Sequence, residues 1–162
     1  MSTLVVRHSL SEANNRNNYG TPAFGHADAP LMPEGRQIAQ NMGLELQSIY
    51  SITPTRTPAA VSKMLRSQET ASEAGFIDIT KYEILNEVDT KLPYPELKEA
   101  IANQQHTPIA LKAAKFILDN PPKEQVWVTH GLVIASLCEV LGISNQFEHF
   151  VPKFCEIRDL PI

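Results

Sequence analysis

Two short apolar runs, each followed by a histidine, constrain the fold of this chain more than any other feature. Thr3–Arg7 precedes His8, and Gln125–Thr129 precedes His130. Short runs rich in β-branched residues are typical of strands that are buried in a central sheet. Ligand sites in such sheets form outside the carboxyl ends of the strands. We therefore expect His8 and His130 to meet at one edge of a sheet.

The remaining sequence alternates between strand patterns and helix patterns. Two weaker strands are expected at residues 57–62 and 77–84, and helix-spaced apolar residues recur over residues 33–49, 111–118 and 134–141. Gly142 stands where a helix C-cap glycine is expected. The alternation predicts a three-layer α/β/α sandwich with a mainly parallel central sheet, and one domain over residues 1–162.

Charge and composition exclude several classes of partner. The 162 residues include 14 Lys and Arg against 18 Asp and Glu, a net charge of -4, whereas non-specific nucleic-acid binders are basic. No stretch approaches the roughly 18 apolar residues of a membrane span. We expect a cytoplasmic protein with no nucleic-acid or membrane partner, and the sequence carries no signal for its oligomeric state. Cys138 and Cys155 lack CxxC spacing and are expected to be buried thiols.

Five blocks of residues that suit a common site follow one another along the chain. They are Arg7-His8-Ser9 with Asn14, Gly25 to Gln37 with Asp28-Ala-Pro30-Leu31, Ser62 to Ala71 with Arg66, Leu85-Asn86-Glu87, and Thr129-His130-Gly131. In this order they resemble the histidine phosphatase superfamily, in the branch that includes the cofactor-dependent phosphoglycerate mutases. The resemblance runs from residue 3 to about residue 135 and implies a phosphoglycerate mutase-like fold. An Arg-His pair alone is a weak signal, but five ordered blocks are a strong one.

The cationic and amide side chains of these blocks suit a phosphoryl group. A transferring phosphoryl group spreads negative charge over three oxygens, so its catalysis is mainly positioning and electrostatic stabilisation. Arg7 and Arg66 can each form forked, charge-assisted hydrogen bonds with those oxygens. Asn14 can add a neutral donor, although an asparagine among other asparagines also fits a turn.

The two histidines and one glutamate complete the predicted chemistry. An imidazole attacks phosphorus when one ring nitrogen is free and a backbone carbonyl holds the other, which is the role expected of His8. His130 would contact the phosphoryl oxygens and help to stabilise transition-state charge. The resemblance implies the same roles, a phosphohistidine at His8, and Glu87 as the acid that protonates the leaving oxygen and then activates water. Glu83 and Asp89 remain alternative acids.

The chain departs from the family pattern in three places. Ser9 replaces the glycine that normally follows the first histidine, where backbone would approach the ligand closely or take a positive φ. The loop over residues 14–25 is longer than usual and is expected to overhang the site. Only about forty residues separate Glu87 from His130, too few for the cap of a mutase. The third departure favours hydrolysis over mutase chemistry.

These patterns predict a metal-independent phosphatase without a cofactor. The substrate would be a phosphorylated small molecule or a phosphoprotein, selected by residues 14–25 and 87–107. One alternative is a phosphatase for phosphohistidine or another phosphoprotein, and another is a catalytically weak phosphate-binding homologue, which Ser9 motivates. The sequence has no HExxH motif, no zinc-type cysteine spacing and no GxxxxGK[ST] loop.

Overall fold

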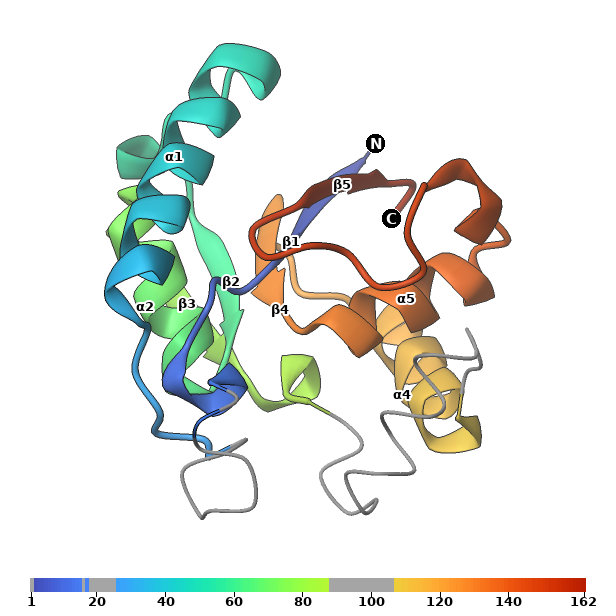
Figure 1. Cartoon of the computed structure of the whole chain (residues 1–162). Helices are drawn as coiled ribbons and strands as arrows, with labels where there is room; N and C mark the ends of the chain where they lie inside the picture. The colour runs from blue at the N-terminus through green and yellow to red at the C-terminus, as the bar shows by residue number, and fades with distance from the viewer. Residues whose placement is uncertain (1, 16, 18–25, 88–106) are drawn as a thin grey trace.

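The strands of the computed structural model form one sheet with the order β3-β2-β4-β1-β5 (Figure 1). The structure describes residues 2–15, 17, 26–87 and 107–162. The strands are β1 (Thr3–Arg7), β2 (Ala59–Ser62), β3 (Ile79–Tyr82), β4 (Val126–Thr129) and β5 (Ile157–Leu160). β1, β2, β3 and β4 run parallel, and β5 is antiparallel to β1. The predicted mainly parallel sheet is confirmed.

The register between β1 and β4 places the two strand-end histidines at the same level. Arg7 pairs with Thr129 in this parallel ladder, so His8 and His130 each follow one member of the same pair. The ladder extends one residue further, because the His8 backbone N–H donates to the Thr129 carbonyl oxygen at 2.9 Å. The expected adjacency of the two histidine strands is confirmed.

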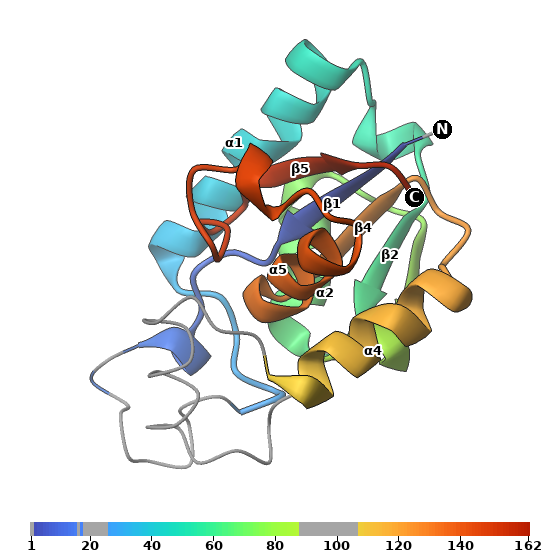
Figure 2. The ribbon, with the colours of Figure 1, turned by 90° about the vertical axis from the view of Figure 1, so that its right-hand side faces the viewer.

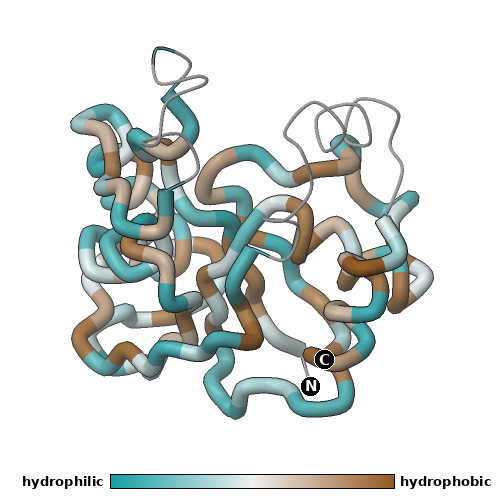
Figure 3. The backbone as a smooth tube through the Cα atoms, turned by 90° about the horizontal axis from the view of Figure 1, so that it is seen from below, coloured by the Kyte–Doolittle hydropathy of each residue, from teal (hydrophilic) through white to brown (hydrophobic). Residues whose placement is uncertain are grey.

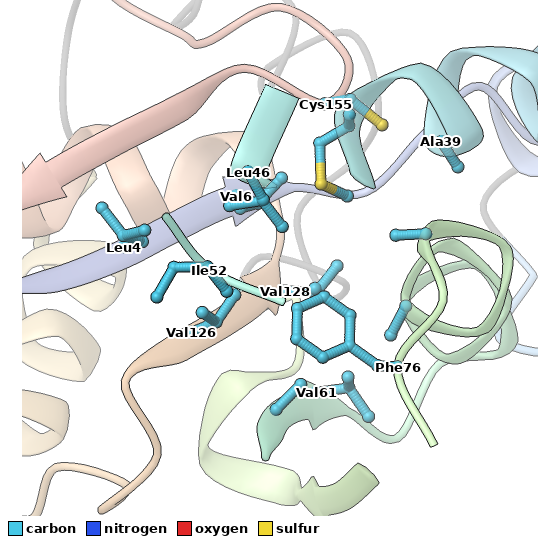
Figure 4. Close-up of a cluster of buried hydrophobic side chains, with 14 residues drawn as sticks. Leu4, Val6, Ala39, Leu46, Ile52, Val61, Phe76, Val126, Val128 and Cys155 are labelled. Carbon is cyan, nitrogen blue, oxygen red and sulfur yellow. The ribbon is translucent and has the colours of Figure 1, made fainter. Parts of the chain in front are cut away.

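Helices cover both faces of the sheet (Figure 2). They are α1 (Pro33–Tyr50), α2 (Leu65–Ala74), α4 (Pro108–Asp119) and α5 (Gly131–Val140), and the short 3₁₀ helices are η1 (Glu12–Asn14), η3 (Pro54–Arg56), η4 (Glu83–Leu85) and η5 (Ser144–Gln146). Alternate strand residues face the two layers. Val128 packs in a buried cluster with residues of α1 and α2 (Figure 4), whereas Trp127 packs with residues of α4 and α5. These three layers make the predicted phosphoglycerate mutase-like α/β/α fold.

The helix boundaries follow from local sequence signals. Thr107 caps α4 by accepting a hydrogen bond from the Ala110 backbone N–H at 3.1 Å, and Pro108 occupies the first turn. Gly75 ends α2 with φ 108°, a left-handed conformation that favours glycine. Gly142 follows α5 with φ 72°, as predicted. Short hydrophobic and hydrophilic stretches follow one another along the backbone (Figure 3).

Some expected elements differ from those of the structure. The strands expected over residues 57–62 and 77–84 are shorter, and the second ends in the 3₁₀ turn η4. The structure also has α2 and β5, for which the sequence patterns predicted no element. The inward face of α2 carries polar residues such as Ser67 and Thr70, so it lacks an apolar helix period. Both cysteines are buried free thiols, as expected. Among the described residues, no helix combines the length and apolar character needed to cross a bilayer.

The N-terminal turn of α1 packs directly on the backbone that follows β1. A Cβ atom at Gly35 would lie 2.0 Å from the Leu10 carbonyl oxygen, and no flexible side chain there can move aside. We expect Gly35→Ala to lower the free energy of unfolding by about 2 kcal/mol, within the usual range for overpacked interiors. Urea unfolding followed by circular dichroism measures this change.

Ser48→Ala is the matched control, because Ser48 is exposed on the same helix. Its effect should stay within roughly 0.5 kcal/mol, as for most surface substitutions. Equal stabilities of the two variants would contradict the close approach of α1 to the strand end.

Candidate active site

The carboxyl ends of neighbouring strands gather the predicted histidines and arginines. Arg7 ends β1 and His8 follows it, while His130 follows β4. Arg66 lies in the first turn of α2, a few residues after β2. The two imidazole rings meet edge to face, with centroids 5.0 Å apart. The site therefore forms where ligands bind in open α/β sheets.

His8 is buried and has one ring nitrogen committed to the backbone. Its Nδ1 lies 2.7 Å from the Ser9 carbonyl oxygen. Because a carbonyl oxygen only accepts hydrogen bonds, Nδ1 carries the proton and Nε2 keeps its lone pair. Burial, followed by the charges of Arg66 and Arg7, lowers the pKa of His8 well below its usual value. His8 is therefore a neutral imidazole with a lone pair on Nε2, as a nucleophile requires.

Ser9 fits the position of the expected glycine without backbone strain. Among the described residues, positive φ angles at non-glycine positions occur only at Ser51 and Cys155. The Ser9 hydroxyl donates to the Gly35 carbonyl oxygen at 2.6 Å, and its backbone N–H donates to Thr70 Oγ1 at 2.9 Å. The replacement of glycine by serine is thus compatible with the backbone that holds His8.

Arg7 is fixed by residues from the far end of the sequence. Its Nη1 donates to the Pro152 carbonyl oxygen at 2.8 Å, and its guanidinium lies 4.1 Å from the centre of the Phe154 ring. A Cβ atom at Gly131 would lie 3.1 Å from Arg7 Nε and 2.6 Å from Val151 Cγ1. Glycine at residue 131 therefore allows the arginine to pack against the start of α5.

Arg66 brings a second buried guanidinium to the site. It is 4% exposed, and its Nη1 donates to the His26 carbonyl oxygen at 3.3 Å. Burial lowers the pKa of Arg7 and of Arg66, and the negative charge of Glu87 opposes this effect in both. Within the described part of the chain, Nε of each arginine is buried without a hydrogen-bond partner. Two buried guanidinium groups with unused donors form a favourable environment for an oxyanion.

His130 lies between two serines and Glu87. Its Nε2 is 2.9 Å from Ser62 Oγ, which is 2.8 Å from Ser67 Oγ. On the other side of the ring, Nδ1 lies 3.5 Å from Glu87 Oε2. Burial, followed by the neighbouring His8, Arg66 and Arg7, lowers the pKa of His130 well below its usual value.

The structure separates the candidate acids. The Glu87 side chain is 22% exposed and faces His130, whereas the Glu83 side chain is 82% exposed and lies 3.9 Å from Lys63 Nζ. Glu87 is therefore the carboxylate placed beside the histidines and arginines. Asp89 lies outside the described residues, as do most of the loop over residues 14–25 and nearly all of the predicted specificity segment over residues 87–107.

Asn14 takes part in a turn. Its Oδ1 accepts hydrogen bonds from the Ser11 hydroxyl at 2.8 Å and from the Ser11 backbone N–H at 3.3 Å, which stabilises the 3₁₀ helix η1. The amide oxygen of Asn14 therefore has the turn-forming role that was the alternative to phosphate binding. A contact between the amide nitrogen and phosphate stays a prediction.

Sequence reasoning assigned no role to several residues that support the site. Ser62 and Thr70 belong to the block over residues 62–71. Their place in that block was the signal that could have linked them to the site. Pro152 and Phe154 lie after the last block, and nothing in the local sequence connects them with Arg7. Their contacts depend on the return of the chain along β5.

Comparisons with known proteins identify the family of the chain. A sequence profile of the histidine phosphatase superfamily (branch 1) matches residues 3–114. A search among curated proteins finds no match.

Several solved structures are similar over nearly the whole chain. TTHB049 from Thermus thermophilus is 24% identical with a TM-score of 0.65, covering 99% of this chain and 94% of that chain. Phosphoserine phosphatase from Entamoeba histolytica, solved with 3-phosphoglyceric acid, is 18% identical with a TM-score of 0.63, covering 98% and 89%. Rv3214 from Mycobacterium tuberculosis is 17% identical with a TM-score of 0.63, covering 98% and 89%. At these identities the likeness concerns the fold.

The two buried imidazoles predict a steep pH dependence of stability. Below a pH of about 6.5 an exposed histidine in the unfolded chain is protonated. His8 and His130 stay neutral in the folded protein, because their pKa values are lowered. The unfolded state then binds more protons, so acid favours unfolding. As the pH is lowered from about 6.5 toward the pKa values of the two imidazoles in the folded protein, the free energy of unfolding should fall. The fall should be about 1.4 kcal/mol per pH unit for each imidazole.

Urea unfolding at intervals from pH 8 to pH 5 measures this slope. His8→Gln should remove about half of the slope, because one of the two groups is lost. His149→Ala is the control, since it removes an exposed imidazole and leaves the two buried ones in place, so that their contribution to the slope remains. A stability that does not change over this pH range would contradict the neutral state of the two imidazoles.

Proposed function

Because the chain belongs to the histidine phosphatase superfamily (branch 1), we propose that it is a phosphatase that hydrolyses a phosphomonoester through a phosphohistidine on His8. One observation carries this proposal. The Ser9 carbonyl oxygen fixes the His8 proton on Nδ1, which leaves a lone pair on Nε2 beside two buried guanidinium groups. A held imidazole next to an anion site is the arrangement that nucleophilic attack on phosphorus requires.

In the first step, His8 Nε2 attacks phosphorus and the ester P–O bond breaks. The electron pair of that bond leaves with the substrate oxygen, which takes a proton from the protonated form of the Glu87 carboxyl group. In the second step, a water oxygen attacks the phosphorus of phosphohistidine and Glu87 accepts the proton of that water. The P–N bond breaks, its electron pair returns to Nε2, and inorganic phosphate is released.

The remaining site residues stabilise charge during both steps. Arg7 and Arg66 would bind the phosphoryl oxygens, and Asn14 would add a donor from its amide nitrogen. His130 would donate a hydrogen bond to the same group as its negative charge redistributes. Both arginines are held by backbone carbonyl oxygens, so little reorganisation is needed when the phosphate binds.

The placement of α4 supports hydrolysis over mutase chemistry. α4 packs against α5 in one helical layer of the sandwich. The inward face of α4, formed by Ala110, Ala114 and Ile117, belongs to the core. Because α4 and β4 both belong to the sandwich, only residues 88–106 and the turn between α4 and β4 are left over from the segment between Glu87 and His130. A mutase has to hold its product in place for a second transfer, which requires a cap over the site.

His8→Ala should abolish turnover of p-nitrophenyl phosphate, because the replacement removes the nucleophile. The wild-type protein should form an acid-labile, base-stable phosphoenzyme that is absent from the variant. Chelation by EDTA should leave the wild-type rate unchanged. Release of p-nitrophenol and phosphate labelling of the protein measure these effects.

His149→Ala provides the control, since it removes an exposed imidazole. It should retain both wild-type turnover and labelling. A His8→Ala variant with the wild-type rate would disprove the nucleophile, and loss of activity on chelation would point to a metal-dependent mechanism.

Glu87→Gln tests the proposed acid and the class of substrate together. An alkoxide is a strongly basic leaving group and needs a proton, whereas p-nitrophenolate does not. The variant should hydrolyse alkyl phosphates on the order of 10²-fold more slowly and p-nitrophenyl phosphate much less slowly. The ratio of kcat/KM for the two substrates measures this difference.

Glu83→Gln is the matched control, because it makes the same change at an exposed carboxylate of the same segment. It should leave both rates unchanged. Small and equal effects of Glu87→Gln on both substrates would remove Glu87 as the acid. The substrate would then be phosphohistidine or another phosphoprotein, whose leaving group needs less help.

A further inference from the structure

Ser62 and Ser67 form a buried hydroxyl pair that the proposed mechanism does not use. Both residues are 0% exposed, and their Oγ atoms lie 2.8 Å apart. Ser62 ends β2, and Ser67 lies in α2 on the turn that carries Arg66. Ser62 Oγ is also 2.9 Å from Nε2 of His130. The pair thus contacts the back of the imidazole that is proposed to bind the phosphoryl group.

The neutral His130 ring carries one proton, which resides on Nδ1 or on Nε2. The two arrangements have different consequences for the site. With the proton on Nε2, the ring would direct a lone pair toward Glu87 and could not donate from Nδ1. With the proton on Nδ1, it presents an N–H donor on the side of Glu87.

Glu87 favours the second arrangement. Its Oε2 lies 3.5 Å from Nδ1, and its negative charge attracts both Arg7 and Arg66. An N–H group facing this carboxylate is attracted to it, whereas a nitrogen lone pair facing the same oxygens would be repelled. Nε2 then accepts a hydrogen bond, and Ser62 is the donor within reach.

We propose that the Ser62 hydroxyl donates to His130 Nε2 and so holds the His130 proton on Nδ1, where it is presented to the phosphoryl group. At 2.8 Å the two hydroxyl groups can share a hydrogen bond in either direction, because hydroxyl hydrogens rotate. When the Ser62 hydrogen is directed to the imidazole instead of to Ser67, Ser67 completes the arrangement by donating to Ser62 Oγ. Ser62 is thus a positioning residue that acts through His130. The expected effect of Ser62 on the rate rests on the proposed phosphatase function. The position of the His130 proton is independent of that function.

Long-range ¹H–¹⁵N correlation spectra of the uniformly ¹⁵N-labelled wild-type protein at pH 8, without substrate, test the tautomer directly. Protonated and unprotonated imidazole nitrogens resonate far apart in such spectra. We expect His130 with a protonated Nδ1 and an unprotonated Nε2. A wild-type spectrum with the proton on Nε2 would overturn the proposal, even if Ser62→Ala fails to fold.

Ser62→Ala removes the donor and leaves Nε2 buried without a partner. Its His130 nitrogen signals should shift toward those of a mixture of tautomers. The kcat for p-nitrophenyl phosphate should fall on the order of 10-fold to 10²-fold, at or below the usual loss for a deleted transition-state donor. Ser136→Ala is the matched control, because Ser136 Oγ is buried and has no hydrogen-bond partner among the described residues. It should change neither readout.

Each outcome bears on the proposal. A Ser62→Ala protein with wild-type nitrogen signals would overturn it, and a loss of kcat without a change of tautomer would show that Ser62 only packs. A wild-type protein that hydrolyses no phosphate ester would disprove the proposed function, while the nitrogen spectra would still decide the tautomer.

Discussion

The parallel pairing of β1 with β4 is the constraint on which the rest of the site depends. Two histidines separated by more than a hundred residues become neighbours because Arg7 and Thr129 form one pair of the ladder. A shift of one residue would turn each side chain of β1 to the opposite face of the sheet. It would exchange Val5 and Val6 between the two helical layers, so the hydrophobic core fixes the register. The packing of the two helical layers against the sheet therefore determines where His8 lies relative to His130.

The electrostatics of the site favour a bound anion. Two guanidinium groups are buried, while burial and the nearby positive charges keep both imidazoles neutral. Among the described site residues, Glu87 brings the negative charge. A bound oxyanion would therefore accept hydrogen bonds from donors that have no partner among the described residues, including Nε of both arginines. The same environment keeps the His8 lone pair available, because protonation would add a third buried positive charge.

Sequence reasoning recovers the parts of the molecule whose signals are local. The strands before His8 and His130 are continuous apolar runs, and α1 has an apolar helix period after Pro33, so both kinds of element were predicted. α2 was missed because its inward face carries Ser67, Thr70 and the guanidinium of Arg66. These buried polar residues occupy positions where apolar residues would have shown a helical period.

The supporting contacts of the site were less predictable. Which oxygen faces His130, and which ring lies over Arg7, depends on how distant segments meet. Ser9 illustrates the limit of motif reasoning. The sequence indicates a departure from glycine, but only the structure shows that α1 offers the Gly35 carbonyl oxygen to the new hydroxyl.

The position of β1 in the sheet has a consequence for synthesis on the ribosome. β1 is translated before the other strands of the sheet, yet its two neighbours, β4 and β5, follow more than a hundred residues later. At roughly 5–20 residues per second, the nascent β1 waits on the order of ten seconds for either partner. During that time its apolar edge is unpaired and open to other chains. A nascent chain of this architecture therefore exposes an unpaired strand edge until β4 and β5 have been made.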